Sequence, residues 1–304
     1  MKKLFLMIAV LCIVLLGIWG CRPDDVSDDS VSVGGFDQNG ASNAVFSVAL
    51  RRTVHFSKGN LQYQASTGTW RFAEHQYDCI GNDNANISST YSGWIDLFGW
   101  GTSGWNSSAN AYQPWSTDTS FSAYYPGGEY TNNLIGDYAN ADWGVYNRIS
   151  NGGNQTGMWR TLTKDEWEYL LNTRSASTAC GYGNVRYAKA TVNNVQGLII
   201  FPDVYIHPNG VATLRNVNES GSVYTAYVLT MSEWDKMQSA GCIFLPAAGG
   251  RDGFSVVFEG SYGLYWSSSY VNEFNTYSMG FYSGYVGMSD FSRGYGFSVR
   301  LVKD

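Results

Sequence analysis

The stretch WRTLTKDEWEY, residues 159–169, contains a clear helix start. Thr163 is followed three residues later by Glu166, which is the spacing of a capping box. In this motif the hydroxyl accepts a bond from an orphan amide, and the carboxylate accepts a bond from the amide of the cap residue. The sequence therefore predicts a helix that begins after Thr163 and buries Trp167. We interpret Glu166 as a capping residue rather than a catalytic acid.

The same pattern recurs in LTMSEW, residues 229–234, where Thr230 and Glu233 have the capping-box spacing. Gly241 is placed to end this second helix in a left-handed turn. Both helices carry a Trp directly after the Glu. We therefore expect both helices to bury that Trp against one core.

Short alternating or apolar runs surround the two predicted helices and indicate β-strands. They lie at residues 46–50, 54–56, 197–201, 242–245, 264–268, 277–281 and 296–302. The order strand, irregular insert, helix, strands, helix, strands predicts an α+β fold. The first and last runs are apolar on one face, so we expect them to pair and to place the two ends of the domain side by side.

The insert, residues 80–157, consists mostly of Gly, Asn, Ser, Trp and Tyr and shows little periodicity. A structureless loop of this length is unusual inside a compact domain. We therefore expect a compact irregular region that is pinned by its tryptophans: Trp94, Trp100, Trp105, Trp115 and Trp143.

The N-terminus has the order of a secretory signal. Two lysines precede an apolar run that ends at Trp19, and Gly20 precedes Cys21. The run is shorter than the ~20 residues that a membrane-spanning helix needs. Its end resembles the lipobox of bacterial lipoproteins, which implies that residues 1–20 are removed and that Cys21 carries lipid. A plain signal peptide cleaved nearby is the alternative.

Residues 21–44 are polar and rich in Gly and Asp, which indicates a flexible acidic tether. The acidic residues behind Cys21 resemble the surface-export signal of Bacteroidetes lipoproteins. This resemblance implies a lipid-anchored protein of the outer membrane that faces the cell exterior, with a merely solvated tether as the alternative. The formal net charge of −6 argues against a nucleic-acid partner, which would need a basic patch.

Three cysteines follow Cys21, namely Cys79, Cys180 and Cys242. If Cys21 carries lipid, at least one of the three is unpaired, and one disulfide plus one free thiol is allowed. The spacing of Cys and His does not match a zinc site. We expect no cofactor.

Calcium is the alternative to a protein without a cofactor. Side-chain oxygens at residues 82–84, Asp137 and Asp142 belong to the types that calcium binds. Turn formation by the same Asn and Asp side chains also explains these positions.

Several blocks of the chain resemble known domains. Residues 159–169 resemble a segment of formylglycine-generating, sulfatase-modifying enzymes. LPAAGGR (245–251), YWSSS (265–269) and GFSVRLV (296–302) resemble related C-type-lectin-like domains from gut Bacteroidetes. The resemblance spans nearly all of residues 45–304. It implies a C-type-lectin-like fold with two helices, small twisted antiparallel sheets, adjacent termini and a large irregular loop insertion.

The resemblance does not extend to the chemistry of the enzymes. Oxidases of that family use a pair of cysteines late in the domain, whereas this chain has no Cys after Cys242. We therefore expect a binding protein that is not an enzyme. A non-catalytic structural module of a surface assembly and a sulfatase-modifying-type enzyme are the alternatives.

Residues 262–295 resemble the hypervariable segment of C-type-lectin-like variable proteins of diversity-generating retroelements. That resemblance implies a surface of variable residues that binds a protein or glycan outside the cell, with Trp266, Met279 and Arg293 as fixed scaffold. Tyr offers rigid contact area, and Ser, Gly and Asn adapt their hydrogen bonds, as in antibody paratopes. Ordinary strands and turns are the alternative explanation. The residues expected to bind the ligand are Tyr262, Tyr270, Asn272, Phe274, Asn275, Tyr277, Tyr282, Tyr285, Ser289, Asp290, Phe291 and Tyr295.

Overall fold

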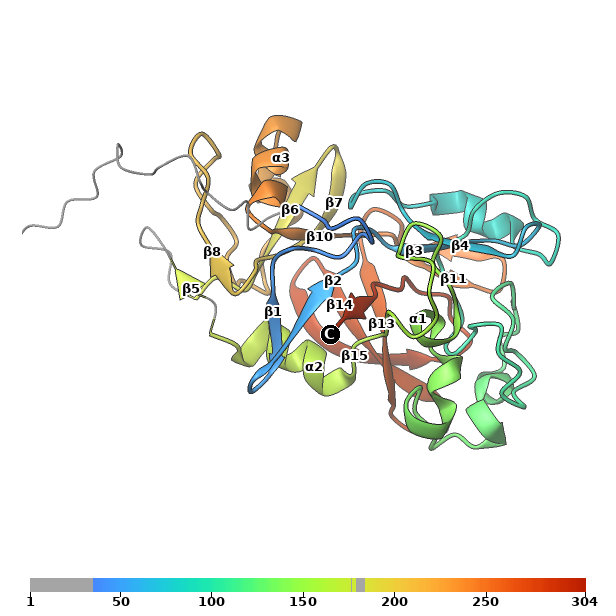
Figure 1. Ribbon diagram of the computed structural model, residues 1–304. Coiled ribbons are helices and arrows are strands. Elements are labelled where there is room, and N and C mark those ends of the chain that lie inside the picture. The colour runs from blue at the N-terminus through green and yellow to red at the C-terminus, as the bar shows by residue number, and fades with distance from the viewer. Residues whose placement is uncertain (1–34, 176, 179–183) are drawn as a thin grey trace, which may run out of the picture. The chain divides into compact units, whose positions relative to one another are not determined.

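The computed structural model describes residues 35–175, 177–178 and 184–304 (Figure 1). Within these residues the chain is α+β, as predicted, with few helices and several small, mostly antiparallel sheets. The predicted signal peptide, Cys21, most of the predicted tether and Cys180 lie outside the described residues. Among the described residues, no helix has both the length and the apolar character needed to cross a membrane.

The helical elements are short. The α-helices are α1 (Trp143–Tyr146), α2 (Lys164–Glu168) and α3 (Met231–Ser239). The 3₁₀-helices are η1 (Gly81–Asn86), η2 (Phe121–Tyr124), η3 (Pro126–Gly128), η4 (Gly136–Ala141) and η6 (Tyr224–Ala226), and η5 (Tyr169–Thr173) is a π-helix. The strands are β1 (Phe46–Ala49), β2 (Arg52–Phe56), β3 (Leu61–Gln64), β4 (Thr69–Phe72), β5 (Ser177–Thr178), β6 (Tyr187–Val192), β7 (Val195–Ile200), β8 (Val204–Tyr205), β9 (Val228–Leu229), β10 (Ile243–Pro246), β11 (Gly250–Asp252), β12 (Ser255–Val257), β13 (Gly263–Tyr270), β14 (Asn275–Tyr282), β15 (Tyr285–Ser292) and β16 (Val302–Lys303).

The two ends of the domain share one sheet, with strand order β1, β2, β16. Val302 pairs with Phe56 and Lys303 pairs with His55 in antiparallel register. The last strand therefore pairs with β2 and not with β1, so the predicted pairing of the first and last strands is wrong, although both ends of the domain lie in this one sheet (Figure 1).

Packed structure begins before the first predicted strand. The polar composition of residues 35–44 predicts the end of a tether, whereas Phe36 bridges to Ser42 and both Ala41 and Ala44 are buried. The backbone turn in this segment is held by Asp37, whose Oδ1 accepts the amide of Ala41 at 2.9 Å. A nearby polar side chain therefore satisfies backbone hydrogen-bond donors in a segment whose sequence shows little hydrophobic periodicity.

The segment 296–301 is extended and fully buried, but it does not form the long regular strand that its alternation predicts. Its backbone bridges in turn to Arg251, Phe98 and Tyr265, and only β16 is a regular strand. The alternation itself holds, because one set of side chains enters a single hydrophobic cluster: Phe297, Val299 and Leu301. This central segment therefore connects several small sheets rather than extending one of them.

The hydrophobic clusters of the two Trp-bearing helices lie on opposite faces of the sheet β10-β7-β6-β9. Helix α2 itself contacts β1 and the sheet β13-β14-β15 (Figure 1). Trp167 of α2 packs in the cluster that contains Leu198 and Ile200. Trp234 of α3 packs in the cluster that contains Ile199 and Phe244. The expectation of one shared core is therefore wrong. Successive residues of β7 point to opposite faces, and both faces are covered where the strand is continuously apolar, from Leu198 to Ile200.

Both predicted capping boxes are present. Thr163 caps α2 with Glu166 as its partner, and Thr230 caps α3 with Glu233 as its partner. The φ of +94° at Gly241 confirms the predicted left-handed turn just after α3.

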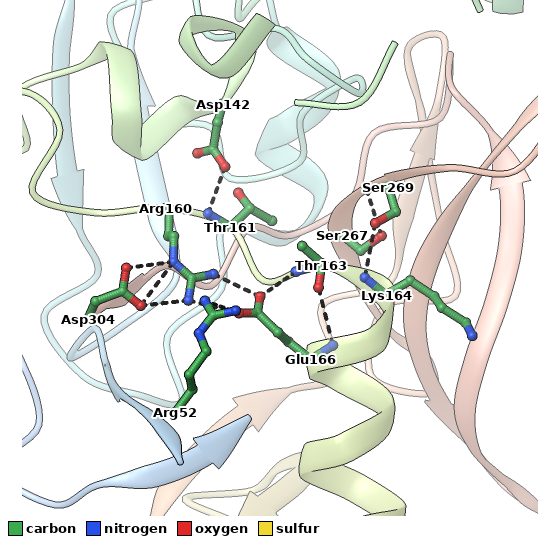
Figure 2. Close-up of polar contacts among 10 residues, drawn as sticks. All are labelled: Arg52, Asp142, Arg160, Thr161, Thr163, Lys164, Glu166, Ser267, Ser269 and Asp304. Carbon is green, nitrogen blue, oxygen red and sulfur yellow. Dashed lines mark hydrogen bonds and ion pairs between the residues drawn. The ribbon is translucent and has the colours of Figure 1, made fainter. Parts of the chain in front are cut away.

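An ion network surrounds the first capping box (Figure 2). Glu166 accepts the Thr163 amide at 2.9 Å, both terminal nitrogens of Arg160 at 2.8 and 2.9 Å, and Nη2 of Arg52 at 3.0 Å. Arg160 also pairs with Asp304 at 2.7 Å. The C-terminal residue, β2 and the start of α2 are therefore tied to one buried carboxylate.

The irregular region is packed on its tryptophans in part, as predicted. Trp100 and Trp143 are fully buried, whereas Trp94, Trp105 and Trp115 are half-buried. The indole nitrogen of Trp100 donates to the Ser267 carbonyl of β13 at 2.8 Å, which fixes the region to the C-terminal sheet.

Asp142 links the irregular region to the segment that precedes α2. Its Oδ1 accepts the Gly144 amide at 2.9 Å. Its Oδ2 accepts the Thr161 amide at 2.7 Å (Figure 2). Burial outweighs these two donors and raises the pKa of the Asp142 carboxyl to about 6.

We expect the Asp142 carboxyl to make stability fall as the pH rises from about 4 to about 6. A carboxyl whose pKa is higher in the folded state than its unfolded value of about 3.9 binds its proton more tightly when folded. Relative to Asp142→Asn, the wild type should lose up to about 3 kcal/mol of unfolding free energy between about pH 4 and pH 7. Urea unfolding across this range measures the difference. Asp137→Asn, which alters an exposed carboxyl of the same region, is the control. A wild-type advantage that stays constant with pH would contradict the assignment.

Candidate ligand-binding surface

The twelve residues predicted to bind the ligand all reach the surface, whereas the interleaved Trp266, Met279 and Arg293 are fully buried. The twelve do not form one patch. Six lie on one face of the sheet β13-β14-β15 or just before or after it: Tyr262, Tyr282, Tyr285, Ser289, Phe291 and Tyr295. Three lie at the β13–β14 turn: Tyr270, Asn272 and Phe274. Three lie on the opposite face: Asn275, Tyr277 and Asp290.

The strand register produces this division. Tyr282 pairs with Tyr285, and Thr276 pairs with Phe291. Paired residues share a face of the sheet, and residues two apart on a strand share it too. Tyr277 falls between these positions and therefore points to the opposite face.

An aromatic row crosses the first face, and it consists of Phe258, Tyr262, Tyr282 and Tyr285. Neighbouring ring centroids in the row are 4.6, 4.5 and 5.1 Å apart, and the two Tyr–Tyr contacts are stacked. The three tyrosines are half-buried and Phe258 is 57% exposed. The row is therefore a continuous set of rings that are held by one another and remain open to solvent.

Two pockets border the aromatic row. Phe258 lines one of about 320 Å³, together with Leu264, Phe291 and Tyr295 and with Asp252 as its exposed acidic residue. The second, of about 260 Å³, is lined by the row and by polar side chains: Tyr262, Tyr282, Gln196, Thr225, Ser261 and Ser283. An apolar group of a ligand would thus fit the first pocket, and a hydrogen-bonding group of the same ligand would meet the polar side chains of the second.

Lys189 supports the row from below. Its ammonium donates to the carbonyls of Tyr282, Ser220 and Ser222, with the Ser220 and Ser222 contacts at 2.7 and 3.0 Å. Burial lowers the pKa of Lys189 to about 8. The bonds hold the β14–β15 turn against the 220–222 loop, which fixes the backbone that carries Tyr282 and Tyr285.

A second aromatic cluster forms where the irregular region meets the β13–β14 turn. Phe274 packs edge-on against Phe121 with centroids 4.6 Å apart, and Tyr130 contacts Tyr270 at 6.4 Å. The guanidinium of Arg293 lies below, 4.9 Å from the ring centroid of Tyr125.

Arg293 ties this cluster to the scaffold. Its Nη2 donates to the carbonyls of Tyr130 and Asn272 at 2.8 and 2.7 Å, and its charge also lies 5.0 Å from the Trp100 ring centroid. Burial lowers its pKa to about 10. The three predicted residues of the turn therefore share one surface with the irregular region rather than with the aromatic row.

The three residues on the opposite face make mostly local contacts. Asn275 donates to Asp290 at 2.7 Å, and the ammonium of Lys164 lies 5.7 Å from the Tyr277 ring centroid. This face also carries Met279 into the core beside α2. These side chains cannot contact the same small ligand as the aromatic row, because the sheet lies between them.

The sequence pattern did not single out Phe258 or Lys189. Phe258 has a φ of +59°, which is unusual for a bulky residue and places its ring beside Tyr262. The available signal in the sequence was a large apolar residue, Phe258, at the start of the largely polar stretch FEGSYG. Lys189 lies in an otherwise apolar strand, where a charged residue indicates a specific internal partner.

The two described thiols are partly or fully buried, and two of the candidate calcium ligands make structural hydrogen bonds. Cys79 and Cys242 are free, burial with nearby carboxylates raises the pKa of Cys79 to about 12, and burial also raises the pKa of Cys242. Both are therefore protonated and weakly nucleophilic near neutral pH. The oxygens of Asn84 and Asp142 already accept backbone amides. Across the described part of the chain, no group of three or more His, Cys, Asp or Glu side chains is arranged to hold a metal ion.

Comparison with known proteins gives one family match. The profile of a domain of unknown function (DUF8237) matches residues 211–302, which include α3 and the sheet β13-β14-β15. No curated protein and no solved structure matches the chain significantly. The matched segment contains the aromatic row but not β1, β2 or the irregular region.

Proposed function

We propose that this chain is a lipoprotein of the outer membrane whose C-type-lectin-like domain, at the cell surface, binds a protein or glycan through the aromatic row and its two pockets. The observation that carries the proposal is the row of stacked, solvent-open rings on a well-packed sheet. The lipobox-like sequence at Cys21 supports the anchor. The adjacent ends of the domain, its small sheets and its irregular insertion are the features that a C-type-lectin-like fold would have.

The arrangement of the row favours binding over a purely structural role. Its rings contact one another, while the core beneath is already filled by Leu264 and Trp266. Stacked tyrosines lose little conformational entropy on binding, and they combine an apolar face with a hydroxyl. Ring faces suit either the apolar side of a sugar or an apolar side chain of a protein.

The buried and exposed positions also match a segment that tolerates variation. Every predicted contact residue reaches the surface, so its replacement leaves the packing of Trp266, Met279 and Arg293 in place. The proposal therefore extends to a hypervariable ligand-binding surface, with the aromatic row at its centre.

Tyr262→Ala and Tyr282→Ala should each weaken ligand binding at least about tenfold, because central aromatic residues dominate binding energy. Tyr277→Ala, on the opposite face of the same sheet, should leave the affinity within about twofold. We would screen the purified protein on arrays of extracellular proteins and glycans, then measure the affinity of each variant for the hit. Binding that depends on Tyr277 and not on Tyr262 or Tyr282 would refute this placement, and a screen without any specific ligand would refute the proposed function.

A further inference from the structure

A third pocket lies far along the sequence from the aromatic row. It has a volume of about 370 Å³ and is formed by the β3–β4 hairpin, the loop that contains residues 103–115 and the end of α1. No residue of the segment 262–295 lines it. Its volume lies in the usual range for small-molecule sites.

Five aromatic side chains line this pocket. Tyr63 and Trp70 are only 5% exposed and form its buried part, with ring centroids 4.4 Å apart. Trp115 is stacked with Tyr63 at 6.2 Å, Tyr112 is half-buried, and Tyr146 is 40% exposed. The rings of Trp115, Tyr112 and Tyr146 therefore offer accessible apolar faces around a fixed aromatic base.

Amide groups complete the lining. Asn147 donates through Nδ2 to the carbonyls of Ser103 and Trp143 at 2.9 and 3.1 Å. These bonds orient the amide, and its Oδ1 has no partner among the described residues. The side-chain amide of Gln113 likewise makes no hydrogen bond within the described part of the chain. The pocket thus contains one oriented acceptor and one amide that can donate and accept.

The loop that carries these groups is held in place. Gly104 donates its amide to the Tyr112 carbonyl at 2.8 Å and has a φ of +93°, which residues with a side chain rarely adopt. Ser103 donates to the Asn140 carbonyl at 2.6 Å and accepts the Trp105 amide at 3.2 Å. Hydrogen bonds within the chain therefore hold this wall of the pocket in place.

The lining selects a class of ligand. It contains no charged side chain, so it offers no strong partner for a phosphate or a carboxylate. A purely apolar ligand would bury Asn147 Oδ1 and the Gln113 amide without partners, which is costly. A neutral sugar ring has C–H groups on one face for an aromatic ring and hydroxyls at its edge for amides. We infer that this pocket is a subsite for a neutral saccharide, separate from the aromatic row.

Binding of simple sugars to the purified full chain tests the inference. The probes are glucose, galactose, mannose, N-acetylglucosamine and their β1,4-linked disaccharides, titrated to about 20 mM because single-ring sites often reach only millimolar affinity. Saturation-transfer NMR detects the bound sugar, and calorimetry gives its Kd. We expect at least one neutral probe to bind, and glucuronic acid to bind at least about tenfold more weakly than glucose or its disaccharide.

Substitutions of the lining residues test whether the sugar binds in this pocket. Trp115→Ala should raise Kd at least about tenfold, and Tyr146→Ala and Gln113→Ala should each raise it about threefold or more. Tyr146 and Gln113 are not core residues, so these variants decide the question if Trp115→Ala does not fold. Trp94→Ala, which alters a half-buried Trp outside the pocket, should leave Kd unchanged. No binding by any neutral probe, or binding that survives the pocket variants, would overturn the inference. Sugar binding that is lost in Tyr282→Ala instead would assign the sugar to the aromatic row.

Discussion

Glu166→Gln should lower the free energy of unfolding by about 3 kcal/mol, because it removes a buried charge that pairs with the partly buried Arg160 and the more exposed Arg52. The Glu166 side chain is only 5% exposed and accepts Arg160, Arg52 and the Thr163 amide. Gln keeps the size of the side chain, but its NH₂ group would face arginine N–H donors. The substitution would weaken the contacts among three parts of the fold, since the network joins α2, β2 and the C-terminal Asp304 (Figure 2).

The second capping box provides a matched control. Glu233 accepts the Thr230 amide at 2.9 Å and the Ala212 amide at 2.9 Å, and these contacts are exposed. Gln serves in a capping box nearly as well as Glu, so Glu233→Gln should cost less than about 1 kcal/mol. Urea unfolding of the two variants compares the same chemical change in two settings. Equal losses would show that capping, and not the buried ion network, accounts for the effect of Glu166.

Local signals in the sequence predicted the helix starts correctly, and nonlocal packing explains where prediction failed. A capping box needs only four residues, and both Thr163 and Thr230 cap as expected. Nothing local tells which sheet face a helix covers. For that reason the sequence predicts one core for Trp167 and Trp234, whereas the sheet between them separates their clusters.

Strand β15 shows the limit of periodicity. Its sequence YVGMSDFS lacks a clean alternation. Val286 on one face enters the core, but Asp290 on the same face is exposed, and the other face carries the large, partly open side chains Tyr285 and Phe291. Gly287 interrupts the pattern further, and a Cβ at that position would lie only 3.0 Å from the Tyr285 hydroxyl oxygen. No strand is predicted over residues 285–292, whereas the structure has the regular strand β15 there.

The candidate site was predictable in composition but not in geometry. The abundance of Tyr, Ser and Asn in residues 262–295 marked side chains that do reach the surface. The division into two faces required the register of β14 with β15. The contributions of Phe258 and Lys189 depend on tertiary neighbours and had no repeated pattern to reveal them.

Trp266→Ala should lower the free energy of unfolding by about 3–5 kcal/mol, the usual cost of removing a buried aromatic side chain. Trp266 is fully buried, its ring lies 4.4 Å from that of Phe297, and its indole N–H donates to the Phe98 carbonyl at 2.7 Å. The change would leave a cavity between β13, the central segment 296–301 and the irregular region. Looser packing there would also disturb the core residues that lie beneath the aromatic row.

Trp94→Ala makes the same chemical change at a half-buried position, where the main partner of the ring is the Arg71 guanidinium, 3.8 Å from the ring centroid. This contact is worth about 1 kcal/mol at most in an exposed setting. Chemical denaturation of both variants should therefore give losses that differ by at least about 2 kcal/mol. If Trp266→Ala is too unstable to purify, Trp266→Phe keeps most of the volume and should cost about 1–2 kcal/mol through the lost hydrogen bond and the smaller ring. A loss for Trp266→Ala no larger than that for Trp94→Ala would mean that the surface segment does not depend on a fixed core beneath it, and the separation of scaffold from contact residues would fail.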